Sequence, residues 1–416
     1  MHKEDLQFLR SNISSIFRNK NFFIYFNLQT ISYMGGWIQG TAISWLIYRL
    51  TGSAFLLGLV NFAAFVPAIL LAPVSGIVTD RFKRKNVLIF TQTIFIIQSS
   101  VFALLFYTKV INVWQIILLS LVFGIVNSFD EPARESFVPL LVKKENLFSA
   151  ISFSSIIGNL SNVFGPAIGG FLIASKGEGF CFITNALLHI PIVLFLIWVR
   201  PREQEIKNVI SPVKHLKEGF LYAINNKPVF FLLIFVGLFC LFGTPFGTLF
   251  PIYSKDILHA GPQGMGILLG VSGIGAVLGA LYLASRKNVI DVKKNIALCG
   301  LIFGLCMLFF AYSKNFIFSN LLLIPVGFAY TIVSSGSNAA LQAMADDYLR
   351  GRIIGLYSAM IMGMFPLGSL FLGYFADKTN PQLAVFSCGI LCVLASVWFM
   401  LKMPRLIKEA KELIKL

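Results

Sequence analysis

Long apolar runs separated by short polar stretches dominate this chain. A helix needs about 20 apolar residues to cross a lipid bilayer. The backbone of a segment inside lipid must satisfy its own hydrogen bonds, so these runs predict helices. Twelve segments qualify, namely 21–48, 55–79, 86–107, 113–133, 149–174, 180–199, 228–252, 263–285, 294–312, 316–345, 353–376 and 382–402.

The longest polar stretch between these runs divides the chain into two similar parts. We expect an N-terminal amphipathic segment (1–20), a six-helix half (21–199), a central linker (200–227), a second six-helix half (228–402) and an amphipathic tail (403–416). The halves repeat weakly, since a shift of 208 residues places Leu57-Gly58 on Met265-Gly266. The expected fold class is therefore an all-α polytopic membrane protein with twelve transmembrane helices in two six-helix halves.

The basic residues lie mostly on one side of the predicted helices. With both termini on the same side, that side carries 28 of the 34 lysines and arginines. The opposite side carries one base in each loop: Arg49, Lys109, Lys176, Lys255, Lys314 and Lys378. Cytoplasmic loops are the ones enriched in Lys and Arg, so both termini are expected in the cytoplasm. The net charge of +16 then reflects topology and does not indicate nucleic-acid binding.

The composition supports a membrane protein and argues against an enzyme. Charged residues make up 12% of the chain, against about 25% in soluble domains. The sequence shows no phosphate-binding glycine-rich loop and no nucleophile–base pair, so we expect no catalytic site and no cofactor. All six cysteines lie in apolar runs. Cys388 and Cys392 share a helix face, but no histidine or carboxylate accompanies them, which favours packing over a metal site.

The loop after the second predicted helix contains an unusual combination of residues. Gly76, Asp80, Arg81, Arg84 and Lys85 form the pattern G-x-x-x-D-R-x-x-R-K. It resembles the loop between spans 2 and 3 of the major facilitator superfamily. The resemblance implies that Asp80 pairs with a neighbouring helix and latches one conformation of an alternating-access carrier. A plain positive-inside loop would explain the bases, but not Gly76 and Asp80.

A second cluster of small residues lies in the fifth predicted helix. Gly158 is followed by Gly165, Pro166, Gly169 and Gly170. Small residues let two helices approach closely, and the proline removes a helix hydrogen bond. The G-P-x-x-G-G pattern is similar to the antiporter motif of exporters in the same superfamily. Generic small-residue packing is the alternative.

Three further stretches narrow the resemblance. They are Gly36-Trp37-Ile38-Gln39, Asp130-Glu131-Pro132-Ala133-Arg134 and Leu349-Arg350-Gly351-Arg352. Together they resemble the twelve-span drug:proton antiporter branch that includes enterobactin exporters and macrolide efflux proteins.

This resemblance implies a secondary transporter of the inner membrane. It would export an amphipathic small molecule, siderophore or drug-like, by alternating access in exchange for protons, as a monomer among membrane lipids. The alternatives are a lipid or lysolipid flippase, an importer of the same fold, and a non-transporting membrane sensor.

No acidic residue lies near the centre of any predicted span, which leaves few candidates for proton coupling. The nearest are Asp130 and Glu131, at the cytoplasmic end of the fourth span, with Arg134 one helical turn later. The spacing makes an ion pair between Asp130 and Arg134 available. A structural salt bridge explains the same residues. His189 is the only histidine deep in the membrane, and a hydrogen-bonded packing role is favoured for it.

The resemblance also implies that spans 1, 4, 7 and 10 line the substrate cavity. Polar and aromatic residues on these spans would suit an amphipathic ligand. The candidates are Gln29, Tyr33, Trp37, Gln39, Asn127, Phe246, Asn338 and Gln342. Pro245 and Pro251 predict bends in the seventh span, because proline interrupts helix hydrogen bonding.

Overall fold

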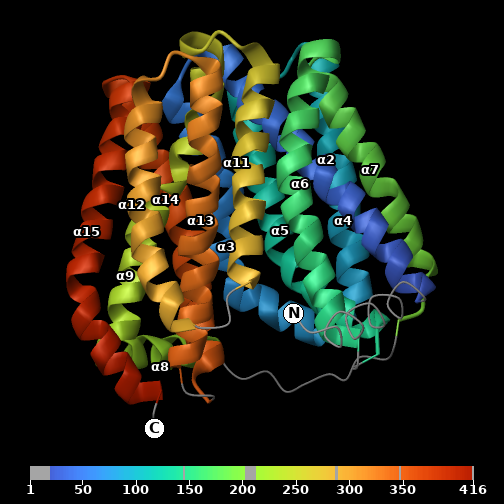
Figure 1. Cartoon of the computed structure of the whole chain (residues 1–416). Helices are drawn as coiled ribbons and strands as arrows, with labels where there is room; N and C mark the ends of the chain where they lie inside the picture. Colours follow the sequence, from blue (N-terminus) through green and yellow to red (C-terminus); the bar gives the residue numbers. More distant parts are fainter. Residues whose placement is uncertain (1–18, 144–145, 202–211, 286–288, 346–347, 415–416) are drawn as a thin grey trace. The chain divides into compact units, whose positions relative to one another are not determined.

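The computed structural model describes residues 19–143, 146–201, 212–285, 289–345 and 348–414, and these residues are almost entirely helical. The first half contains α2 (Lys20–Thr51), α3 (Ala54–Arg81), α4 (Arg84–Tyr107), α5 (Val113–Leu141), α6 (Leu147–Lys176) and α7 (Glu178–Trp198). The second half contains α8 (Pro212–Asn225), α9 (Lys227–Phe242), η2 (Thr244–Leu249), α10 (Phe250–Ile252), η3 (Tyr253–Ile257), α11 (Gly261–Ala284), α12 (Val289–Tyr312), α13 (Phe316–Met344), α14 (Arg350–Lys378) and α15 (Pro381–Ile414). Figure 1 follows these elements along the chain.

Most of the long helices have the length and composition of membrane spans. Among the described residues, ten helical segments meet both criteria, and they do not include α2 or α6. Many polar side chains interrupt the apolar sequence of α2, and several of them are buried. The structure therefore shows a multi-pass helical membrane protein, while the number twelve stays a prediction.

The contacts divide the chain into two compact units. Unit 1 contains Met1–Ile43 and Leu70–Ile210, and unit 2 contains Ser44–Ile69 and Ser211–Leu416. The boundary therefore crosses α2 after Ile43 and α3 after Ile69, in addition to the central linker. The last part of α2 and the first part of α3 belong, by their contacts, with the second half of the sequence.

Unit 1 is built around α4, which packs against α5 and α7. An apolar cluster fills one end of this unit, with Phe22 and Tyr25 from α2, Leu88 from α4 and Phe137 from α5. The rings of Tyr25 and Phe137 meet edge to face with centroids 5.2 Å apart. This is a favourable geometry for aromatic pairs, and it holds α2 against α5.

Unit 2 contains closely packed helix pairs, of which α11 with α13 and α12 with α15 have extensive contacts. Figure 1 shows α11, α12, α13 and α15 in yellow to red. Gly275 and Gly327 lie at the contact between α11 and α13, where a Cβ on either would overlap the backbone of the other helix. In lipid, helices associate through such close packing, because the surrounding tails are as apolar as the side chains.

The seventh predicted span is interrupted where its prolines suggested. α9 ends at Phe242, and Thr244–Leu249 continue as a 3₁₀ segment that contains Pro245. A short α-turn with Pro251 and a π-helical segment, Tyr253–Ile257, follow. Proline cannot donate a backbone hydrogen bond, so the regular α pattern is lost here.

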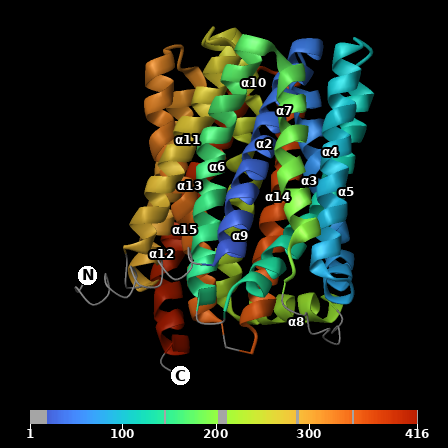
Figure 2. The same ribbon diagram turned by 90° about the vertical axis from the view of Figure 1, so that its right-hand side faces the viewer.

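Two elements extend beyond the predicted spans. Residues 212–225 of the expected linker form α8, which contacts α9 and α14 and lies across their ends in Figure 2. α15 continues without a break to Ile414, so the expected tail begins inside a helix rather than as a separate element. Residues 1–18 and 202–211, which carry most of the expected N-terminal segment and part of the linker, lie outside the described residues.

Candidate functional site

Buried polar side chains gather on one face of α4 in unit 1. Thr91 and Gln98 are seven residues apart, as are Gln92 and Ser99, so each pair lies two helical turns apart on one side of the helix. All four are at most 2% exposed. A buried polar group without a partner is costly, so this face must meet other polar groups.

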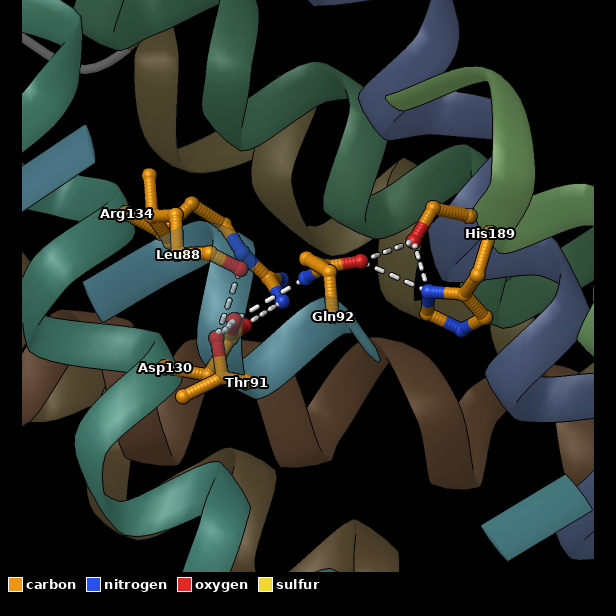
Figure 3. A network of polar contacts seen from close by, with 7 residues as sticks. Leu88, Thr91, Gln92, Asp130, Arg134 and His189 are labelled. Carbon is orange, nitrogen blue, oxygen red and sulfur yellow. Dashed lines mark hydrogen bonds and ion pairs between the residues drawn. The ribbon is translucent and has the colours of Figure 1, made fainter. Parts of the chain in front are cut away.

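Asp130 of α5 is fully buried and contacts this face of α4 (Figure 3). We call Asp130 and the side chains joined to it, Thr91, Gln92, Arg134, Ser32 and His189, the first polar group. Its Oδ1 accepts hydrogen bonds from Thr91 Oγ1 at 2.5 Å and from Gln92 Nε2 at 2.9 Å. Its Oδ2 forms an ion pair with Arg134 on the next turn of α5. The sequence prediction of this ion pair is confirmed.

Gln92 links Asp130 to His189 of α7. Its amide nitrogen donates to Asp130, so its Oε1 faces the other way and lies 2.6 Å from His189 Nδ1. Ser32 Oγ of α2 lies 3.3 Å from the same oxygen and 3.0 Å from Nδ1. An amide oxygen only accepts, so this arrangement assigns a proton to Nδ1. The hydrogen-bonded role predicted for His189 agrees with these contacts.

Arg134 also contacts α2. Its Cζ lies 4.2 Å from the centre of the Tyr33 ring, a cation–π distance. Tyr25, Gln29 and Tyr33 follow one another at four-residue spacing on α2, and Tyr25 packs against Phe137 of α5. In the described part of the chain, the Tyr25 hydroxyl and both amide atoms of Gln29 are buried without a hydrogen-bond partner. Such groups usually bind water or a ligand.

A second polar group lies further along α2, α4 and α7. Gln39 Oε1 accepts from Ser99 Oγ at 2.7 Å and from Asn185 Nδ2 at 2.9 Å. Gln39 Nε2 donates to Gln98 Oε1 at 3.0 Å, and Gln98 Nε2 reaches the Leu119 carbonyl at 3.2 Å. These neutral side chains join α2, α4 and α7 by hydrogen bonds, and within this group only Asn185 Oδ1 is buried without a partner among the described residues.

The two groups differ in what they can do chemically. The second contains no charged side chain. The first holds a carboxylate and a guanidinium inside a membrane domain, where ionised groups are expensive and usually functional. A carboxylate can take up a proton and release it. Uptake of a proton by Asp130 would remove its charge and so break the ion pair with Arg134. Glu131, the other candidate acid, is half-buried beside Asp130.

The loop predicted to act as a latch lies at the junction of α3 and α4. Lys85 Nζ donates to the carbonyl oxygens of Ile197 and Val199, at 3.0 and 2.8 Å, and so caps the C-terminal end of α7. Asp80 is half-buried and Arg81 is exposed. Within unit 1, no atom lies within 4 Å of a Cβ built on Gly76, so no neighbouring helix of this unit packs closely against that glycine.

The glycines of the predicted antiporter motif divide into two kinds. A Cβ on Gly165 would lie 2.5 Å from Trp37 Cβ, and one on Gly169 would lie 3.1 Å from Thr41 Cβ. Both glycines therefore bring α6 into close contact with α2 on either side of Pro166. Gly170 is also buried, whereas Gly158 has open space around it.

The predicted cavity residues have varied surroundings. Gln39 is buried in the second polar group, and Phe246 is buried against the rings of Phe250, Phe303 and Phe310. Trp37 is 40% exposed, and Asn127 is half-buried.

Two cavity candidates in unit 2 lie together. Asn338 and Gln342 line a cavity of about 500 Å³ together with Ser335 and Arg350. Gln342 Nε2 donates to Asn338 Oδ1 at 2.7 Å, and the Gln342 carbonyl accepts from Arg350 Nε at 3.2 Å. The cavity therefore presents the amides of two α13 residues and the guanidinium of Arg350 at the start of α14.

Sequence reasoning missed five members of the polar groups: Thr91, Gln92, Gln98, Ser99 and Asn185. A signal existed, since two adjacent polar pairs seven residues apart in an apolar span mark one helix face. Among the described residues, no group of three or more His, Cys, Asp or Glu side chains could hold a metal ion.

Comparisons with known proteins agree with this architecture. The sequence matches the family described as transmembrane secretion effector over residues 12–415. The staphyloferrin A transporter of Staphylococcus aureus (strain NCTC 8325 / PS 47) is 23% identical over 381 residues, covering 90% of this chain and 95% of the relative. Macrolide efflux protein A of Streptococcus pyogenes is 24% identical over 374 residues, covering 88% and 92%.

The crystal structure of the nucleoside transporter NupG has a similar fold. Its TM-score is 0.72 at 17% sequence identity, and the match covers 92% of this chain and 99% of that one. The family match spans nearly the whole sequence, and the relatives are transporters rather than enzymes. The chain therefore belongs to the transmembrane secretion effector family of the major facilitator superfamily.

Proposed function

We propose that this protein exports an amphipathic small molecule, a siderophore or a drug-like compound, by alternating access in exchange for protons. The observation that carries the coupling is the buried Asp130–Arg134 pair with its two neutral donors, Thr91 and Gln92. The substrate class is supported by the relatives, one a staphyloferrin A transporter and the other a macrolide efflux protein.

The geometry suggests how a proton would act. A proton that binds Asp130 Oδ2 forms an O–H bond at the oxygen that faces Arg134 and removes the charge that holds the guanidinium. Oδ1 keeps its bonds from Thr91 and Gln92, so the position of α4 against α5 is retained. Arg134 is then free to turn along α2, where Tyr33 already contacts it. Loss of the proton restores the pair.

Such a step can drive transport if the two conformations bind the proton unequally. A ligand shifts a conformational equilibrium only by its difference in affinity for the two states. In an exporter of this kind, protonation of Asp130 favours one conformation and substrate binding favours the other. Glu131 is the second candidate for the same role, because it neighbours both Asp130 and Arg134.

Substrate recognition is proposed for both units. In unit 2, Asn338 and Gln342 line a cavity with Arg350, which would suit hydroxyl and carboxylate groups. In unit 1, Gln29, Tyr33 and Trp37 are proposed to contribute amide and aromatic surfaces. We further propose that the chain functions as a monomer and that both termini lie in the cytoplasm, as the distribution of bases predicts.

The test is a proton-flux assay in everted membrane vesicles with an acidic interior. Siderophores, macrolides, dyes and lysolipids are added singly, and a compound that dissipates the gradient only when the protein is present is a substrate. The Asp130→Asn and Glu131→Gln variants are then compared with Glu135→Gln, which changes an exposed acid on the same helix. We expect coupled flux to be lost in the first or the second variant and kept in the third.

Two results would oppose the proposal. If Asp130→Asn and Glu131→Gln both keep the coupled flux of Glu135→Gln, neither acid carries the proton. If no compound in the panel dissipates the gradient, but lysolipids cross the membrane independently of it, the protein acts as a flippase instead.

A further inference from the structure

The end of α14 carries a sequence that matches the predicted latch at the end of α3. Residues 373–378 read Gly-Tyr-Phe-Ala-Asp-Lys, and residues 76–81 read Gly-Ile-Val-Thr-Asp-Arg. Each places a glycine four residues before an aspartate that a base follows, and each closes a long helix. In the α14 copy, the aspartate is Asp377.

Asp377 caps the first turn of α3. Its Oδ1 accepts from the Ala54 backbone N–H at 2.6 Å. Its Oδ2 accepts from Ser53 Oγ at 2.6 Å and from the Phe55 N–H at 3.1 Å. These amides have no partner within their own helix, and the helix dipole favours an anion there. Helix caps normally come from an adjacent residue, whereas this one comes from 323 positions away.

The backbones of α3 and α14 touch beside this cap. A Cβ on Gly373 would overlap the Ala54 carbonyl group and lie 3.1 Å from Phe55 Cα. One turn into α3, a Cβ on Gly58 would overlap the Ser369 carbonyl group. The Phe55 and Tyr374 rings meet edge to face at 6.2 Å. Glycine at both positions therefore lets the carboxylate reach the amides of α3.

Within unit 2, a line of polar contacts continues from this junction along α3. Asn61 Nδ2 donates to Thr248 Oγ1 at 3.2 Å, and Thr248 Oγ1 donates to Ser369 Oγ at 3.3 Å. At the end of α2, the Tyr48 hydroxyl donates to Asp256. These contacts explain why Ser44–Ile69 belong to unit 2 rather than to unit 1.

We propose that Asp377 is a conformational latch for the end of α3 opposite Asp80. The proposal rests on the alternating-access function proposed above, in which the ends of the helices separate in turn. The carboxylate holds α3 against α14 in the conformation described here, and it must leave the α3 amides before this end can open. The same G-x-x-x-D-base pattern is thus associated with both ends of α3.

The test measures directly how often the junction of α3 and α14 opens, and it needs neither a substrate nor a proton gradient. Leu57 lies beside the junction and is 1% exposed. In purified protein whose six native cysteines are replaced, Leu57→Cys should react with maleimide only when the junction opens. We expect Asp377→Asn to raise the labelling rate about five- to tenfold, the equilibrium effect typical of losing a charged helix cap.

Two further variants make the result specific. Ser53→Ala removes one donor to Asp377 and also the local cap that Ser53 Oγ gives the Leu56 N–H at 3.2 Å. It should raise labelling in the same direction, and the combined effect with Asp377→Asn should be smaller than the sum of the two single effects. Asn315→Ala removes an ordinary cap, since Asn315 Oδ1 accepts from Phe318 N–H at 3.0 Å within one turn of α13. It should leave labelling unchanged, which separates opening from general destabilisation.

An unchanged labelling rate in Asp377→Asn and Ser53→Ala, in protein that elutes as a single folded species, overturns the latch. An equal rise in Asn315→Ala also overturns it, because the effect would then be non-specific. If the wild-type protein transports nothing but the labelling pattern holds, the latch is a property of the fold and only the transport proposal fails.

Discussion

The ion pair between Asp130 and Arg134 offers a prediction whose size can be worked out from the structure. Asp130 is fully buried, and the Arg134 side chain is 12% exposed. Removing one member of a buried pair leaves the other charge uncompensated, which typically costs about 3–5 kcal/mol. We therefore expect Asp130→Asn to lower the unfolding free energy by about 3 kcal/mol or more, since Arg134 cannot lose its charge.

The double variant separates the pair from the rest of the site. In Asp130→Asn with Arg134→Gln neither charge remains, while Thr91 and Gln92 keep an acceptor at position 130. Its loss of stability should be smaller than the sum of the two single losses by about 2 kcal/mol, because contacting residues are coupled by about 0.5–3 kcal/mol.

The assay can use cysteines that the protein already contains. Cys181, Cys240 and Cys392 are at most 2% exposed, so a thiol-reactive fluorophore reports unfolding as they become accessible. A domain of about 200 residues loses about 2–4 °C of Tm per kcal/mol, so Asp130→Asn should melt at least about 6 °C lower. Glu135→Gln is the matched control and should shift Tm by less than about 2 °C. Strict additivity of the single variants, or a Tm of Asp130→Asn equal to that of the control, would refute the reasoning.

Two other predictions concern contacts between helices, and a third concerns Asp80. Gly165→Ala places a methyl group against Trp37 and should lower the unfolding free energy by about 1–3 kcal/mol. The control Gly158→Ala places its methyl group in open space and should be neutral or slightly stabilising. Equal Tm shifts of the two variants would contradict this. Asn185→Leu removes the hydrogen bonds that Asn185 Nδ2 donates to the buried Gln39 and Ser99, and it should lower the unfolding free energy by about 1–3 kcal/mol. The control Asn27→Leu, at an exposed position, should lower it by less than about 0.5 kcal/mol in the same melting assay. Asp80→Asn should leave the protein folded and inserted but slow substrate efflux from vesicles; efflux at the wild-type rate would end the latch interpretation of Asp80.

The helical architecture could be predicted because bilayer thickness and backbone hydrogen bonding act on each segment separately. Runs of apolar residues predicted the positions of the helices, and i, i+4 spacing predicted the pair of Asp130 with Arg134. Both depend only on local geometry.

The partners of these residues depend on which helix faces meet, and no single segment contains that information. Thr91 and Gln92 therefore went unnoticed, although their spacing from Gln98 and Ser99 marked a face. The polarity of Gln39 can be read from the sequence, but its contact with Asn185 cannot. The cap of α3 by Asp377 joins residues 323 positions apart, which local patterns do not connect.

The interruption of the seventh span also has a geometric consequence for the rest of its length. A 3₁₀ segment turns about 120° per residue and an α-helix about 100°, so the six residues Thr244–Leu249 add about a third of a revolution. The π-helical residues Tyr253–Ile257 turn more slowly and so compensate part of it. The 3₁₀ and π-helical segments together thus set the direction around the helix axis in which Asp256 points toward Tyr48. Regular α-turns between Thr244 and Leu249 would rotate Asp256 away from Tyr48, so the prolines set the direction in which the span points its acid.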